Sequence, residues 1–187
     1  MIYEPLEDSY LLKEQVIKFA RDKSVLDLGS GSGILAIAAE KAGAKSVLAS
    51  DINEESIKHI KNLNIKAIKS NLFASIKGKF DLIIFNPPYL PLDKREPFDS
   101  QLATTGGKKG DEIILLLLKQ SKYHLNKDGI ILLLLSSLTP RKRIISLLKS
   151  LSLKYKIISS KNLFMETLEV WEISKKIKTR FKTSIKQ

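Results

Sequence analysis

The stretch Leu26-Asp27-Leu28-Gly29-Ser30-Gly31-Ser32-Gly33 decides which fold class this chain can adopt. It continues a short apolar segment, Ser24–Leu28, that is typical of a buried strand, and residues 33–42, rich in Ala, Ile and Leu, follow it as an expected helix. Glycines at such a turn let the backbone approach a ligand at the crevice of an α/β sheet. The stretch therefore predicts a ligand-binding strand, turn and helix.

Outward from this turn, apolar strands alternate with amphipathic helices along most of the chain. Such alternation predicts a mostly parallel sheet with helices on both faces. We expect one domain over residues 1–174 and a basic tail over 175–187, and the long segment 87–110 is typical of a lid or a binding loop. The expected strands are 24–28, 46–50, 65–69, 80–85 and 130–135, then a hairpin of 154–159 and 167–173; the expected helices are 7–20, 33–42, 54–62 (capped by Asn53), 111–124 (capped by Asp111) and 140–149.

Composition excludes several classes of protein. The 187 residues suit one domain with a sizeable core, and there is no cysteine for a disulfide or a thiolate metal site. His59 and His124 stand far apart in helix-like contexts, so we expect no metal site. The longest apolar runs are too short to span a bilayer, and the acidic start is unlike a signal peptide. The cytoplasm is the expected location.

The chain is strongly basic, with a formal net charge of +12, which favours anionic partners. Residues 175–187 alone hold six basic residues and no acidic one. This tail is either a solvated end of the chain or a contact for RNA, the ribosome or an acidic protein face.

Acidic residues around the glycine turn indicate the kind of ligand. A dinucleotide fingerprint would need glycine at position 34, where Ile34 stands, and Asp27 would repel a pyrophosphate. S-adenosylmethionine carries an ammonium, a sulfonium and no phosphate, so Asp27 suits its amino acid moiety. Asp51 ends the next strand and can accept from ribose hydroxyls. After the third strand, Asn71 could bond the adenine or be an ordinary turn residue, and Leu72 could pack on the ring.

A second motif, Asn86-Pro87-Pro88-Tyr89, follows the apolar strand Phe80–Phe85. The prolines fix φ and remove two backbone donors, and the residue before a proline is held extended. What remains is a side-chain amide, several carbonyls and an aromatic ring. This set suits a flat NH2 group, because oxygens can accept its hydrogens while the ring covers its face.

Taken together, these motifs resemble those of the HemK-type glutamine-N5 methyltransferases, in their short archaeal and eukaryotic branch. The resemblance runs to about Ile173. Its motifs are Tyr3-Glu4-Pro5-Leu6-Glu7-Asp8-Ser9-Tyr10-Leu11-Leu12, the glycine turn, Asp51-Ile52-Asn53, Asn86-Pro87-Pro88-Tyr89, Gly106-Gly107-Lys108-Lys109-Gly110 and Glu166-Thr167-Leu168.

The resemblance implies a class I S-adenosylmethionine-dependent methyltransferase with a seven-stranded sheet whose last strand is antiparallel. It implies methylation of the glutamine in the Gly-Gly-Gln motif of class 1 peptide chain release factors, with a small zinc-binding activator subunit at the sheet edge 65–70. Asn71 stands where family members often have an acid. The implied catalytic residues are Asn86, Pro87 and Tyr89, and the implied cofactor-binding residues are Ser9, Asp27, Gly29, Gly31, Asp51, Ile52, Asn71, Leu72 and Asn86.

Two other functions stay open from the sequence. A methyltransferase acting on exocyclic amines of adenine or cytosine in RNA or DNA could use the same Asn86 and Tyr89 on a flipped base. The basic charge favours this alternative, whereas no segment reads as a separate base-recognition domain. A cofactor-binding or RNA-binding module without activity is the third interpretation, and the complete glycine turn with Asn86 argues against it.

Overall fold

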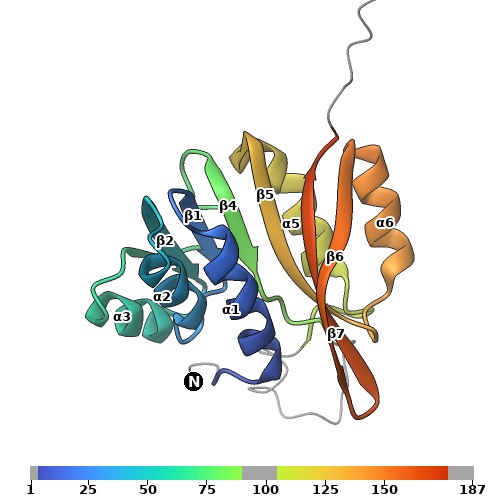
Figure 1. Cartoon of the computed structure of the whole chain (residues 1–187), viewed down its shortest axis with the longest axis horizontal. Coiled ribbons are helices and arrows are strands. Elements are labelled where there is room, and N and C mark those ends of the chain that lie inside the picture. Colours follow the sequence, from blue (N-terminus) through green and yellow to red (C-terminus); the bar gives the residue numbers. More distant parts are fainter. Residues whose placement is uncertain (1–3, 90–104, 177–187) are drawn as a thin grey trace, which may run out of the picture.

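The computed structural model describes residues 4–89 and 105–176, which form five helices and seven strands. Strands and helices alternate up to α6 except between β3 and β4, which no helix separates, and β6 and β7 then follow each other without a helix between them (Figure 1). The elements are α1 (Glu7–Phe19), β1 (Ser24–Leu28), α2 (Ile34–Lys41), β2 (Ser46–Asp51), α3 (Glu54–Asn62), β3 (Ala67–Lys69), β4 (Phe80–Phe85), α5 (Glu112–His124), β5 (Leu125–Ser136), α6 (Arg141–Ser150), β6 (Leu153–Leu163) and β7 (Glu166–Lys175).

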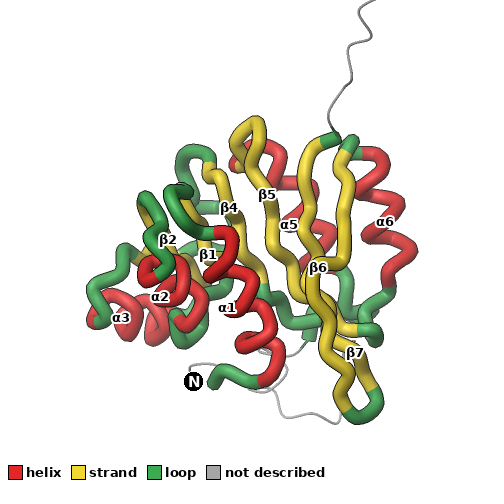
Figure 2. The backbone as a smooth tube through the Cα atoms, viewed as in Figure 1, coloured by secondary structure: helices red, strands yellow, loops and turns green. Residues whose placement is uncertain are grey.

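All seven strands form one sheet in the order β3-β2-β1-β4-β5-β7-β6. Figure 2 shows this sheet in yellow, with every strand but β3 labelled. Every pair from β3 to β5 is parallel, while β7 runs antiparallel to both β5 and β6. The predicted class I methyltransferase fold, with its antiparallel last strand, is confirmed. Because the parallel strands point the same way, the ends of β1, β2, β3 and β4 lie at one edge of the sheet.

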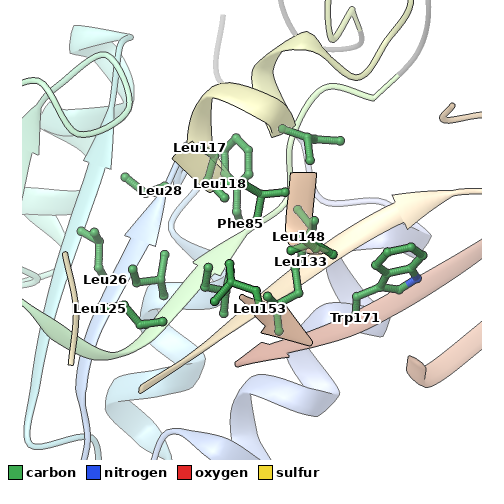
Figure 3. Packing of buried hydrophobic residues seen from close by; sticks show 14 of the residues in the cluster. Leu26, Leu28, Phe85, Leu117, Leu118, Leu125, Leu133, Leu148, Leu153 and Trp171 are labelled. Atoms are coloured by element: carbon green, nitrogen blue, oxygen red, sulfur yellow. The ribbon is translucent and has the colours of Figure 1, made fainter. Parts of the chain in front are cut away.

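Helices cover both faces of the sheet, which explains why its central strands read as continuous apolar runs. Along β4, Leu82 and Ile84 pack towards α1 and α2, whereas Ile83 and Phe85 pack towards α5 and α6. Figure 3 shows the hydrophobic cluster between the sheet and α5 and α6, in which Phe85 lies close to Leu117 and Leu118 of α5.

Most predicted elements are confirmed, and the differences have local causes. The third strand begins at Ala67, because buried Ile65 still completes the end of α3, its N–H reaching the Ile60 carbonyl at 3.4 Å. Asp111 stands at the start of α5 without capping it, since its buried carboxylate pairs with Arg143 at 2.9 Å. β6 and β7 are longer than expected because their antiparallel pairing continues past the apolar positions, and β5 begins earlier because Leu125 pairs in parallel with Phe80 of β4.

The β6–β7 hairpin is fastened beside the start of α1. Lys161 of β6 pairs with Glu7, and the backbone N–H of Ser137 donates to the Thr167 carbonyl at 2.8 Å. β7 extends to Lys175, the residue at which the basic tail was expected to begin, and residues 177–187 lie outside the described part. Within the described ranges, no helix is long and apolar enough to cross a membrane.

Candidate active site

The glycine turn connects β1 to α2 and is fastened to β2. The Ser30 N–H donates to the Ser50 carbonyl at 3.0 Å, and the Ser30 hydroxyl donates to the Asp27 carbonyl at 2.8 Å. Left-handed backbone at three positions lets the chain turn sharply here, a conformation that glycine adopts without strain. These positions are Gly29, Gly31 and Gly33, with φ of 64°, 51° and 80°.

Asp27, at the end of β1, is fully buried. Neither of its carboxylate oxygens has a hydrogen-bond partner within the described residues. Burial raises the pKa of this carboxyl from its ordinary 3.8 to about 7; the nearby Ser30 hydroxyl and Ala36 N–H oppose the rise, and the charge of Asp51 adds to it. A buried acid without partners is unfavourable for folding, so Asp27 is a strong candidate to bind a cationic ligand.

Asp51 ends β2 and faces the glycine turn. Its Oδ2 accepts from the Gly31 N–H at 2.8 Å and its Oδ1 accepts from the Asn53 N–H at 2.8 Å. Each carboxylate oxygen has a second lone pair, so the side chain can still accept from a ligand. The adjacent Ile52 is 64% exposed, an apolar side chain left open beside the acid.

The turn after β3 carries Asn71 and Leu72. Asn71 is exposed, and its carbonyl accepts from the Ala74 N–H at 3.1 Å. Leu72 has a φ of 47°, unusual for a branched side chain, and the Ser70 hydroxyl holds its carbonyl at 2.8 Å. The role of this turn in binding adenine stays a prediction.

Asn86 is held by two residues of α1. Its Nδ2 donates to Asp8 Oδ2 at 3.1 Å and to Ser9 Oγ at 3.3 Å, while its Oδ1 is buried with no partner in the described chain. Ser9, predicted to touch the cofactor, therefore lies against the Asn86 amide. Sequence reasoning missed Asp8: it lies in the quoted Glu7-Asp8-Ser9 pattern, but only the fold shows its partner 78 positions away.

Tyr89 is half-buried against the cluster that includes α1 and α2. Burial raises the pKa of its phenol above the usual value, and the charges of Asp8 and Glu166 add to the rise. The phenol therefore stays protonated and can act as a donor. The Tyr89 carbonyl accepts from the Thr139 hydroxyl at 3.4 Å, which ties the end of the motif to the segment after β5.

The glycine-rich segment 106–110 packs directly against this turn. A Cβ on Gly106 would lie 2.6 Å from the Pro88 carbonyl oxygen and 2.4 Å from that of Gly110. Only glycine permits this approach. Residues 90–104, which hold most of the predicted binding loop, lie outside the described part of the chain.

The predicted residues thus gather at one edge of the sheet, in two groups. Gly29, Gly31, Asp27 and Asp51 surround the glycine turn, and Ser9, Asn86 and Tyr89 surround the end of β4. Over 4–89 and 105–176, no cluster of His, Asp or Glu could hold a metal ion. His124 is stacked on Phe73, with its Nδ1 3.0 Å from the Gly78 carbonyl, beyond the opposite ends of the strands.

Fold and site together define a class I methyltransferase. The family model described as "Methyltransferase small domain" matches residues 8–165, and the chain belongs to this family. The protein is therefore an enzyme of the methyltransferase class. Its similarity to a protein N5-glutamine methyltransferase confirms the resemblance found in the sequence.

Among individual relatives, the chain is 41% identical to "Putative protein N5-glutamine methyltransferase" of Methanocaldococcus jannaschii, over 90% of this chain and 89% of that protein. It is 45% identical to "Ribosomal protein L11 methyltransferase" of Lactobacillus acidophilus, but over only 57% of this chain and 29% of that protein. The solved E. cuniculi Mtq2-Trm112 complex, described as responsible for methylation of the eRF1 translation termination factor, aligns with a TM-score of 0.76 at 25% identity, covering 94% of this chain and 99% of that one.

Proposed function

We propose that this enzyme transfers a methyl group from S-adenosylmethionine to the side-chain amide nitrogen of the glutamine in the Gly-Gly-Gln motif of a peptide chain release factor. The observation that carries the proposal is the buried, unpartnered Oδ1 of Asn86 at the end of β4. An oxygen in that state needs an N–H donor, and an amide NH2 supplies one. The near full-length similarity to a glutamine methyltransferase supports the same substrate class.

The residues at the glycine turn fit the proposed cofactor. Asp27, buried and unpartnered, would accept the ammonium of the amino acid moiety, and Asp51 would accept from the ribose hydroxyls. Exposed Ile52 and half-buried Leu72 would pack on the adenine, with Asn71 at its edge. When bound, S-adenosylmethionine supplies a methyl group activated by its sulfonium.

The substrate amide needs positioning more than it needs acid or base chemistry. Its nitrogen is a weak nucleophile because its lone pair is delocalised into the carbonyl. Asn86 Oδ1 and the Pro87 carbonyl would accept its two N–H bonds, and the Tyr89 ring would cover its plane. Holding two reacting atoms in attack geometry can lower the barrier by about 7–11 kcal/mol.

No strong base is needed in advance, because the amide proton becomes acidic only once the nitrogen has accepted the methyl group. Two residues that could otherwise act as a base are accordingly not available to the reacting amide: His124 is at the far ends of the strands, and Tyr89 stays protonated. Solvent can take the proton that leaves.

An activator subunit at the β3 edge belongs to the proposal. β3 is three residues long and lies at the end of the strand order, paired with β2 alone among the described strands. Such an edge offers unpaired backbone groups to an added strand. The similar solved structure is a two-protein complex, which supports a partner subunit here. That this partner is small and binds zinc is what the resemblance in the sequence implies.

The test is purified enzyme with methyl-labelled S-adenosylmethionine, offered a release factor, the same factor with its motif glutamine changed to alanine, RNA and DNA. We expect label in the intact factor alone, in the presence of the activator if one is required. Undiminished label in the alanine variant, or stronger label in RNA or DNA, would replace the proposal with the exocyclic-amine alternative.

A further inference from the structure

We propose that Asp8 is a positioning residue, which fixes the orientation of the Asn86 amide so that Oδ1, and not NH2, faces the substrate. This inference rests on the proposed function, in which Asn86 Oδ1 receives an N–H of the substrate. It assigns a role to an acid of α1 that neither the glycine turn nor the Asn-Pro-Pro-Tyr turn contains.

The orientation of an amide follows from the chemistry of its neighbours. A carboxylate only accepts hydrogen bonds, so the amide group 3.1 Å from Asp8 Oδ2 must be the nitrogen of Asn86. Ser9 Oγ, at 3.3 Å, could donate or accept and would tolerate either orientation. Asp8 is therefore the residue that decides which way the amide points.

The opposite orientation would be unproductive. The terminal torsion of an asparagine side chain has two broad, roughly equivalent minima, so the amide is free to flip unless a neighbour prevents it. In the flipped state the Asn86 NH2 would meet the NH2 of the substrate, donor against donor. The buried Oδ1 would then face Asp8, acceptor against acceptor. This arrangement is unfavourable because Asp8 is only 6% exposed.

The same contact strengthens Oδ1 as an acceptor. A hydrogen bond donated to a carboxylate polarises the amide, and hydrogen bonds in a chain reinforce one another in a region of low dielectric. Asp8 lies in the first turn of α1, where the helix dipole favours negative charge. The chain from Asp8 through Asn86 to the substrate N–H would thus hold the reacting nitrogen more firmly and raise its electron density.

Kinetics of Asp8→Asn tests the proposal, with Glu7→Gln as the matched control. Glu7 adjoins Asp8 in α1, but it is exposed and pairs with Lys161. We expect Asp8→Asn to lower kcat by about tenfold to a hundredfold. KM for the release factor, the Kd for S-adenosylmethionine and the melting temperature should change little, and Glu7→Gln should stay within about twofold of wild type in kcat.

A double-mutant cycle separates positioning from a structural role. If Asp8 acts through Asn86, Asp8→Asn should have no further effect on single-turnover rates in an Asn86→Ala background. An equal rate loss in both backgrounds would overturn the proposal, and so would a loss of melting temperature without a loss of kcat.

A third measurement does not depend on the substrate. The side-chain NH2 protons of Asn86, assigned by their absence in Asn86→Ala, should exchange slowly in wild type and faster in Asp8→Ala. Free exchange in wild type would overturn the Asp8 contact, whatever the enzyme methylates. An enzyme that methylates no release factor but shows slow exchange would refute the proposed function and keep the contact.

Discussion

At the scale of single residues, the site consists of groups that a core would normally exclude. Asp27 is the clearest case, because a buried acid without a partner weakens folding. Its folded-state pKa of about 7 lies above its ordinary 3.8, so the penalty is absent below pH 4, grows as pH rises towards 7 and is constant above. This sign is opposite to that of an ion-paired acid.

Replacing Asp27 by asparagine should therefore increase the stability of the free enzyme and weaken ligand binding. We expect Asp27→Asn to raise the melting temperature of the free enzyme, with a gain that increases between pH 4 and pH 7 and then levels off. S-adenosylmethionine binding should weaken, because the ammonium loses its partner. Melting curves across pH 4–8 and calorimetric titration would check both effects, and an equal stability gain at pH 4 and pH 8 would contradict this explanation.

Asp27 should also make cofactor binding depend on pH in the wild type. Below pH 7 the buried carboxyl holds a proton, which must leave before the ammonium is accepted. We expect affinity for S-adenosylmethionine to fall as pH drops from 8 to 5.5, and the fall to be smaller in Asp27→Asn. Titrations at matched ionic strength would measure this, and a pH-independent wild type would refute it.

Asp51 and Asn86 should separate binding from turnover. Asp51→Ala removes the proposed ribose acceptor, and hydrogen bonds to a charged group contribute about 1.5–3 kcal/mol each, so cofactor affinity should fall at least tenfold. Asn86→Ala removes the group proposed to hold the reacting amide, so this substitution should lower kcat and leave cofactor affinity nearly unchanged. Steady-state kinetics with direct binding would decide, and near-normal kcat in Asn86→Ala would disprove the role of that side chain.

At the scale of elements, close backbone packing couples two motifs that are separate in the sequence. A Cβ on Gly106 would come within 2.6 Å of the Pro88 carbonyl oxygen, so Gly106→Ala should displace the Asn-Pro-Pro-Tyr turn and lower kcat by tenfold or more. Gly129→Ala is the control: its Cβ would lie 2.8 Å from the Phe80 carbonyl, where β4 begins. Both variants should lose stability, but only Gly106→Ala should lose activity per folded molecule.

The tip of the β6–β7 hairpin carries strain that can be removed. Phe164 and Met165 form its two-residue turn, and Met165 has a left-handed φ of 71° while its side chain is 83% exposed. Since glycine adopts this backbone freely, Met165→Gly should raise the free energy of unfolding by up to about 1 kcal/mol. Phe164→Gly, whose φ is not left-handed, should give no gain in the same denaturant titration.

At the scale of the whole molecule, much of the fold followed from local patterns. Apolar runs such as Phe80–Phe85 predicted the strands correctly, because both faces of a parallel sheet are buried. The absence of a helical pattern after residue 159 predicted the terminal hairpin. Asn53 was a correct cap because its side chain bonds to the Glu55 N–H, two residues away. Predictions from local sequence were correct where both hydrogen-bonding partners lie close together in the sequence.

Long-range partners could not be predicted in the same way. Asp111 looked like a helix cap, but Arg143, 32 positions away, takes its carboxylate. Asp8 looked like an ordinary acid in a first helical turn, and its bond to Asn86 exists only because α1 packs beside the end of β4. The motifs thus named residues that gather at one edge of the sheet, whereas the Asp8 contact to one of them, Asn86, was not predicted.

The net charge of +12 leads to a last expectation about how the whole enzyme meets its substrate. If the basic surface steers an acidic face of the release factor, kcat/KM should fall as salt rises, because exposed charges are screened over about 10 Å at 0.1 M salt. Saturating kcat should stay nearly constant, since positioning at Asn86 is buried and short-range.

A short Gly-Gly-Gln peptide of zero net charge should show little salt dependence. Deleting residues 177–187 removes Lys178, Arg180, Lys182 and Lys186 without removing an acid, so it should flatten the salt dependence if the tail takes part. Equal salt responses for peptide and intact factor would exclude steering by the protein's charge.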